Sequence, residues 1–69
     1  MTEKQISVPE IHCDHCKESI EGAVAALPGV ELVNVDVDAR SVLVRFEESV
    51  TDEDTITAAI EEQGYEVPR

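Results

Sequence analysis

The chain has 69 residues with one Phe, one Tyr and no Trp, so we expect one small domain over residues 1–69 with a core of aliphatic side chains. Sixteen acidic residues against five basic ones give a formal net charge of -11, whose field repels phosphates and anionic lipid headgroups. This charge argues against nucleic acid and membrane surfaces as partners. We expect the scattered acidic residues to form mainly an ordinary solvated surface, although the same field would favour a cationic ligand or a basic docking face.

The N-terminus, "MTEKQISVPE", has no apolar segment of the kind that a secretory signal peptide contains. The longest apolar run, "AVAAL", is far too short to span a bilayer. We therefore expect a cytoplasmic protein without membrane insertion. In that reducing compartment, two cysteines three residues apart are metal ligands or catalytic groups more often than a structural disulfide.

A short strand is predicted just before the cysteines. Ile6 and Val8 alternate with polar residues, and Pro9 then ends the strand because it cannot donate a hydrogen bond to a neighbour. The segment "EIHCDHCKES" follows. Cys13 is thus expected in a strand-to-helix loop, and Cys16 in or beside the first turn of the helix.

The residues after the cysteines predict an amphipathic helix. Its apolar stripe has the helical spacing i, i+4 and i+7 and consists of Ile20, Val24 and Leu27. Asp14 is the expected N-cap, and the helix should end at Pro28 and Gly29.

Two alternating runs then predict a β-hairpin. The inward side chains should be Val33, Val35 and Val37 in the first run and Val42, Val44 and Phe46 in the second. The residues "DARS" between the runs form the expected turn, from Asp38 to Ser41.

A second helix is predicted after the hairpin, with Thr51 as its N-cap and Gly64 as its stop. Its apolar stripe consists of Ile56, Ala59 and Ile60. The remainder, "YEVPR", is long enough only for a short last strand that Pro68 ends.

The order of these elements is typical of an α+β fold of the ferredoxin-like βαββαβ type. Right-handed crossovers give a four-stranded antiparallel sheet with both helices on one face. In this topology the end of the first strand, the hairpin turn and the start of the last strand share one edge of the domain. Tyr65 should therefore lie near the cysteine loop.

The start of a helix favours thiolate over thiol, because free amide donors and the positive end of the helix dipole lie there. Cys13 and Cys16 are therefore expected to lose their protons more easily than a free cysteine. Their spacing across a loop lets both sulfurs face one ion. Two soft thiolates with few other ligands suit Cu(I) better than Ca, Mg or Mn, whose ligands are oxygens.

Three other roles for the two cysteines agree less well with the sequence: a structural zinc site, a redox pair and a purely structural role in the core. Two cysteines and two histidines match the four ligands of a structural zinc site in number, but neighbours on one loop can hardly surround an ion, and the sequence has no second pair. An open site that binds zinc weakly is a further alternative. A thiol-disulfide redox role is weakened by the short chain and by the charge of Asp14. A purely structural role in the core is disfavoured by the polar neighbours.

Two histidines and one tyrosine are the further candidates for this site. His15 lies inside the Cys-x-x-Cys, where it is either a third ligand, a ligand to a metal shared with a second molecule, or a solvated side chain. His12 is adjacent to Cys13, and we expect it to point elsewhere into solvent. Tyr65 is either an apolar cover that shields a bound metal from water or ordinary packing at the edge of the sheet.

The Cys-x-x-Cys between a first strand and a first helix, the order of elements and the closing "EEQGYEVPR" resemble the heavy-metal-associated domains of copper chaperones and metal-pumping ATPases. The likeness covers nearly the whole chain, and "CDHC" with a late "QGYEV" is most similar to the bacterial CopZ-type chaperones. The family usually has Gly-Met-x-Cys where this chain has Glu10, Ile11 and His12 before Cys13. Ile11 should keep the loop anchored as a hydrophobic replacement, whereas Glu10 adds charge and stiffness.

The resemblance implies that Cys13 and Cys16 bind Cu(I), that His15 can assist in a copper-bridged homodimer, and that Tyr65 lies beside the site. It implies a copper chaperone and not an enzyme. The implied partner carries a similar dithiol, such as a copper-transporting P-type ATPase. Because the same sulfurs suit other thiophilic ions, binding or detoxification of mercury, cadmium or zinc is the alternative.

Overall fold

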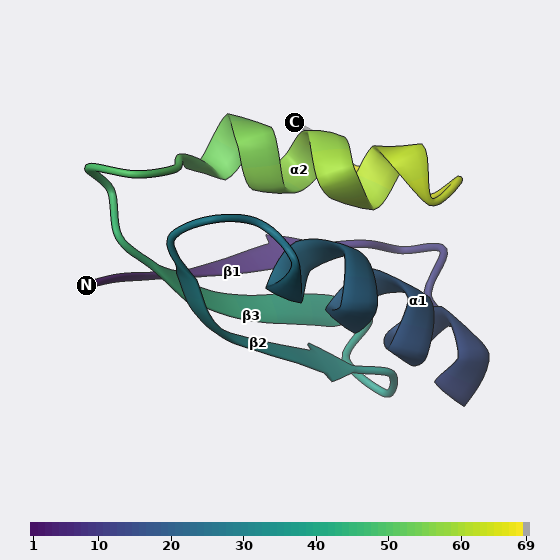
Figure 1. The fold of residues 1–69 in the computed structure, drawn as a ribbon. Coiled ribbons are helices and arrows are strands. Elements are labelled where there is room, and N and C mark those ends of the chain that lie inside the picture. Colours follow the sequence, from purple (N-terminus) through teal and green to yellow (C-terminus); the bar gives the residue numbers. More distant parts are fainter. Residues whose placement is uncertain (69) are drawn as a thin grey trace.

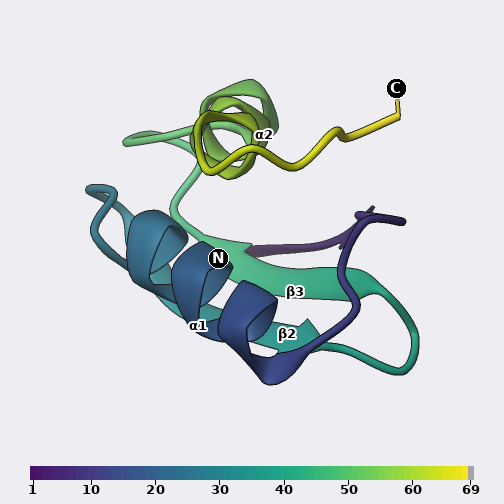
Figure 2. The ribbon, with the colours of Figure 1, turned by 90° about the vertical axis from the view of Figure 1, so that its right-hand side faces the viewer.

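The computed structural model describes residues 1–68. Over these residues the chain forms a three-stranded sheet with two helices on one face (Figures 1 and 2). The elements in chain order are β1 (Thr2–Ser7), α1 (Asp14–Ala25), β2 (Val30–Asp36), β3 (Ser41–Phe46) and α2 (Glu53–Glu62). The predicted order of elements is therefore confirmed from the first strand to the second helix.

The core lies between the sheet and the two helices. β3 is the central strand, and β1 and β2 each pair with it in antiparallel fashion. Val42 of β3 is opposite Ile6 on one side and Val35 on the other, and all three side chains are buried. The helices complete the core with the buried side chains Cys16, Ile20, Val24, Ile56, Thr57, Ala59 and Ile60. The two-residue and helical periodicities of the sequence thus identified the buried faces.

The expected fourth strand over residues 65–69 is a wrong prediction for the part of the chain that the structure describes. Residues 65–68 contain no strand, and residue 69 lies outside the described range. The backbone N–H of Glu66 donates a hydrogen bond to the Glu10 carboxylate instead of to a strand. Pro68 has no N–H to donate. The sheet therefore has three strands where the sequence predicted four.

Both predicted helix caps are displaced by one residue. The N-cap of α1 is Cys13, in an extended conformation, and Asp14 is the first helical residue. The N-cap of α2 is Asp52, whose carboxylate accepts a hydrogen bond of 2.8 Å from the backbone N–H of Thr55. Thr51 is buried, and its hydroxyl oxygen lacks a hydrogen-bond partner among residues 1–68. A carboxylate at the N-cap also gains from the helix dipole, which explains why Asp52 takes this position.

Gly29 forms the turn between α1 and β2. The helix ends at Ala25, a little before the predicted Pro28 and Gly29. Gly29 has a φ of +86°, and a Cβ atom there would lie 2.8 Å from the Cβ atom of Val50. Glycine is therefore required both for the left-handed conformation and for the close approach of the loop that precedes α2.

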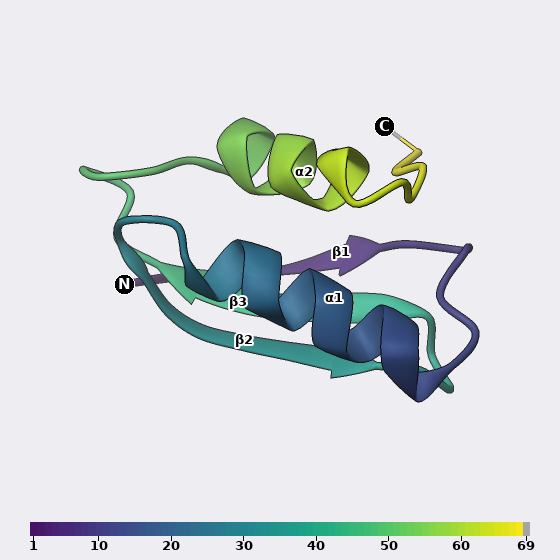
Figure 3. The same ribbon diagram turned by 45° about the vertical axis from the view of Figure 1, so that its right-hand side comes forward.

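Three connecting segments meet at one end of the molecule, as the topology predicted. Figure 3 shows the β1–α1 connection, the β2–β3 turn and the C-terminal end of α2 at the same end. The backbone N–H of Val8 donates a hydrogen bond of 2.9 Å to the carbonyl oxygen of Arg40 in the turn. Gly64, with a φ of +95°, ends the last helical segment and leads to Tyr65. This end carries the cysteines.

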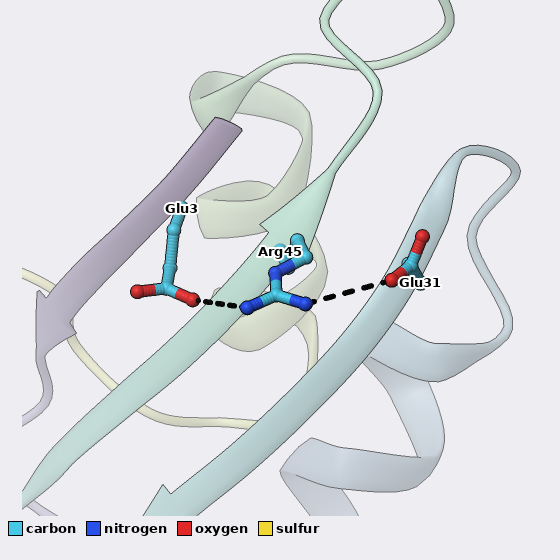
Figure 4. Close-up of polar contacts among 3 residues, drawn as sticks. All are labelled: Glu3, Glu31 and Arg45. Atoms are coloured by element: carbon cyan, nitrogen blue, oxygen red, sulfur yellow. Dashed lines mark hydrogen bonds and ion pairs between the residues drawn. The ribbon is translucent and has the colours of Figure 1, made fainter. Parts of the chain in front are cut away.

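A set of ion pairs crosses the three strands on the face of the sheet away from the helices. Arg45 of β3 lies 3.0 Å from the carboxylate of Glu3 on β1 and 3.7 Å from that of Glu31 on β2 (Figure 4). All three side chains are exposed, so solvent screens each pair and its contribution to stability is small. This face is solvated and lies apart from the cysteines.

Candidate metal site

The two cysteines lie at the N-terminal end of α1. Cys13 is the cap residue in place of the predicted Asp14, and Cys16 lies in the first turn, as the sequence predicted. Their sulfur atoms are 3.5 Å apart. Since a disulfide bond is ~2.05 Å long, the pair is a reduced dithiol. Both sulfurs can therefore act on one bound ion.

The two sulfurs differ in exposure. Cys13 is half-buried, whereas Cys16 is 5% exposed and packs against the core. Cys16 is thus part of the core, a role that the polar neighbours in the sequence had argued against. Its sulfur also faces that of Cys13. The helix fixes the position of Cys16, and the side chain of Cys13, which precedes the first helical residue, can turn without breaking the helix.

Ile11 anchors the loop that leads to the cysteines. Its side chain is fully buried in the core, and its backbone N–H donates a hydrogen bond of 3.1 Å to the carbonyl oxygen of Val8. The prediction that a hydrophobic residue here holds the loop is confirmed. A loop anchored in this way presents Cys13 to α1 in a defined position.

The surroundings of Cys16 favour its thiolate. The hydroxyl group of Tyr65, and after it the backbone of His12, lower the pKa of Cys16 from 9.0 to about 7, although burial acts in the opposite direction. The same contact with Cys16 raises the pKa of Tyr65. The prediction that Tyr65 lies near the cysteine loop is therefore confirmed. The direction of the pKa shift of Cys16 agrees with the prediction, but its first cause is Tyr65 and not the helix start. A thiolate ligand is available near neutral pH.

His12, and not His15, lies next to the sulfurs. The ligand atoms of His12, Cys13 and Cys16 all lie within 4.8 Å of one another. The Nδ1 atom of His12 is 3.9 Å from the sulfur of Cys16 and 2.8 Å from the carbonyl oxygen of Glu10. His15 is exposed on the first turn of α1 and does not belong to this group of ligand atoms in residues 1–68.

His12 is exposed to solvent, as expected, but the expectation that it points away from the site is wrong. His12 immediately precedes the N-cap Cys13, and its ring lies over the first turn of α1, beside the sulfur of Cys16. The four-residue spacing of His12 and Cys16 is the sequence signal that could have indicated this contact.

An open hollow borders the site on the side of the C-terminal segment. It is lined by Pro9, Glu10, His12, Arg40, Gly64 and Tyr65. His12 and Tyr65 belong both to this hollow and to the surroundings of Cys16, so the hollow lies beside the cysteines, and neither cysteine lines it. The arrangement is one half-buried and one buried thiol beside one imidazole and one phenol.

Comparison with models of protein families identifies the family of this chain. A model of the heavy-metal-associated domain matches residues 5–66. The chain belongs to the heavy-metal-associated domain family. The two cysteines at the start of α1 are thus in the setting that the sequence resemblance implied. Within residues 1–68, neither helix has the length and apolar character needed to cross a membrane.

Several proteins similar to this heavy-metal-associated domain have names that mention copper. The copper chaperone CopZ of Staphylococcus haemolyticus is 40% identical over 67 residues, which are 97% of this chain and 98% of that protein. A probable copper-exporting P-type ATPase of Archaeoglobus fulgidus is 40% identical over 65 residues, which are 94% of this chain and 8% of that protein. The solved structure of a CopZ metallochaperone superimposes with a TM-score of 0.94 at 30% identity and covers 97% of this chain and 100% of its own.

Proposed function

We propose that this heavy-metal-associated domain is a cytoplasmic copper chaperone, which binds one Cu(I) ion between the thiolates of Cys13 and Cys16 and delivers it by ligand exchange. The observation that carries the proposal is the reduced dithiol at the start of α1, with sulfurs 3.5 Å apart, in a chain similar to CopZ chaperones over nearly its whole length. The protein is a carrier and not an enzyme.

Two thiolates suit Cu(I) because it is a soft ion that needs few ligands. The lowered pKa of Cys16 supplies one of them near neutral pH. The half-buried position of Cys13 leaves the other open to an incoming molecule. Tyr65, beside Cys16, shields the ion from water on the side of the C-terminal segment.

Transfer is an exchange of ligands without a change of oxidation state. An incoming thiolate adds to the bound Cu(I) and makes it three-coordinate, then one sulfur of the chaperone leaves, and the second follows. Because Cys13 precedes the helix and is more exposed than Cys16, its bond to copper should break first. The low coordination number of Cu(I) keeps the barrier to this exchange small.

The proposed partner is a similar dithiol domain of a copper-transporting P-type ATPase. The likeness of this chain to a segment of the Archaeoglobus fulgidus ATPase supports a partner with the same fold. The net charge of -11 favours a partner with a basic docking face. Raising the salt concentration should therefore weaken docking, since the Debye length falls from ~10 Å at 0.1 M to ~3 Å at 1 M.

His15 has a conditional role in this proposal. It is exposed on α1, so it can reach a metal ion held by a second molecule. His15→Ala should reduce copper-dependent homodimers more than binding of the first ion. Sedimentation during a copper titration measures this, and equal dimerisation of both proteins would contradict it.

The central test is competition for Cu(I) with a chromophoric chelator. Cys13→Ser and Cys16→Ser should each abolish tight binding, because one thiolate cannot hold the ion against the chelator. Glu18→Gln, an exposed change on the same helix, is the control and should bind as the wild type does. Wild-type affinity in both cysteine variants would refute the proposed function.

A further inference from the structure

We propose that His12 is a third ligand of this site, which binds a divalent thiophilic ion such as Zn²⁺ together with Cys13 and Cys16 and is not needed for Cu(I). The inference rests on the proposed function in one respect, that the two cysteines hold the metal. It assigns a specificity-determining role to a histidine that stands immediately before the Cys-x-x-Cys.

The spacing of the two sulfurs supports a third ligand. Two sulfurs that are ~2.3 Å from one ion lie ~3.8 Å apart at a tetrahedral angle and ~4.6 Å apart when they face each other across the ion. The sulfurs of Cys13 and Cys16 are 3.5 Å apart. This separation fits an ion that has further ligands beside the two sulfurs. A linear complex requires the sulfurs to separate by about 1 Å, which rotation of the Cys13 side chain can supply.

The His12 ring lies close to the position that a third ligand would take. A nitrogen and a sulfur bound to one zinc ion at a tetrahedral angle lie ~3.6 Å apart. The Nδ1 atom of His12 is 3.9 Å from the sulfur of Cys16, and the three ligand atoms lie within 4.8 Å of one another. The ring therefore needs only a small shift to coordinate the same ion.

Coordination replaces a hydrogen bond that His12 makes in the metal-free site. The Nδ1 atom is 2.8 Å from the carbonyl oxygen of Glu10, and because a carbonyl oxygen only accepts, Nδ1 carries the proton there. To bind a metal through Nδ1, the neutral ring moves this proton to Nε2 by exchange with water. Glu10 is exposed, so water can take over the hydrogen bond to its carbonyl oxygen.

The two kinds of ion then use the site differently. Cu(I) is satisfied by two soft thiolates, and the His12 ring can keep its hydrogen bond to Glu10. Zinc takes four ligands, and three protein ligands with one open position are a common arrangement of zinc that exchanges its fourth ligand. His12 therefore raises the affinity for zinc without raising the affinity for Cu(I) to the same degree.

The experiment compares the zinc and Cu(I) affinities of four proteins by chelator competition: the wild type, His12→Ala, His15→Ala and Glu18→Gln. His12→Ala removes a direct ligand, so zinc binding should weaken by at least roughly 10-fold, the lower end of the loss seen when only an outer-shell partner of a metal ligand is removed. Its Cu(I) affinity should change by less than about threefold, because both thiolates remain. Glu18→Gln, an exposed change on α1, is the control for both ions.

A spectroscopic measurement tests coordination directly. The ring nitrogen signals of His12 in the nuclear magnetic resonance spectrum should shift when zinc is added to the wild type and stay nearly constant with Cu(I). A zinc affinity that is unchanged in His12→Ala would overturn the inference. So would a loss of zinc affinity in His15→Ala while His12→Ala binds zinc as the wild type does. Either result leaves the Cu(I) proposal intact, since that proposal fails only if the cysteine variants keep Cu(I).

Discussion

The hydroxyl group of Tyr65 lies near the thiol of Cys16, and its effect is the largest of those that lower the pKa of Cys16 to about 7. This pair of residues joins the C-terminal segment to the first turn of α1. Tyr65→Phe keeps the ring but removes the hydroxyl group. We expect the pKa of Cys16 to rise from about 7 toward the ordinary value of 9.0.

This shift can be measured from thiolate absorbance during a pH titration of the metal-free protein. The titration is made in a Cys13→Ala background, so that only Cys16 contributes a thiolate signal. An unchanged titration midpoint in Tyr65→Phe would show that the hydroxyl group does not stabilise the thiolate.

The same pKa makes stability depend on pH. Because the folded protein holds the Cys16 thiolate with a pKa of about 7, against 9.0 for an ordinary thiol, the contribution of Cys16 to stability is absent well below pH 7. It grows as the pH rises from about 7 to 9 and is fully present above that range. The urea midpoint of the reduced, metal-free protein should rise in this window, and Cys16→Ser should lack this rise. Parallel curves for the two proteins would contradict the assignment.

The side chain of Ile11 holds the loop through its packing in the core. It is fully buried, so Ile11→Ala should destabilise the fold by about 2–5 kcal/mol through lost burial and the cavity that remains. Ile11→Met, the residue usual in the family, conserves volume and should cost less than about 1.5 kcal/mol. Urea unfolding of both variants measures the difference. Equal losses of stability in the two variants would mean that the fold does not depend on the volume that this side chain fills.

The parts of the fold that follow from local pattern were predicted well. The stripe of Ile56, Ala59 and Ile60 and the alternation from Val42 to Phe46 depend on periodicity, which the sequence displays directly. Cys13 and Cys16 were placed correctly because their spacing and the helix start are local too.

The errors concern a cap position with two adjacent candidates, a contact between distant segments, and a local turn before the first helix. Asp52 takes the cap position that was assigned to Thr51, because the two candidates are adjacent and the carboxylate makes the hydrogen bond. The prediction of a last strand is wrong because the backbone N–H of Glu66 donates a hydrogen bond to the Glu10 carboxylate. This contact joins segments that lie far apart in the sequence. His12 turns toward Cys16 through the local geometry before the cap, which apolar periodicity does not reveal.

Glu10 links the cysteine loop to the C-terminal segment by two different groups. Its carboxylate accepts the backbone N–H of Glu66, and its carbonyl oxygen accepts the ring N–H of His12. Glu10→Ala removes the first contact and leaves the second. Hydrogen exchange at the Glu66 amide should then become about tenfold faster, because a hydrogen bond to a charged acceptor is lost at an exposed position.

Glu10→Gln is the matched variant for this measurement, because its side-chain oxygen still accepts a hydrogen bond while the charge is gone. Its exchange rate at Glu66 should lie between those of the wild type and Glu10→Ala. The ring nitrogen signals of His12 should stay constant in both variants, since each keeps the backbone carbonyl of residue 10. Exchange at Glu66 that is as slow in Glu10→Ala as in the wild type would show that the carboxylate does not hold the C-terminal segment.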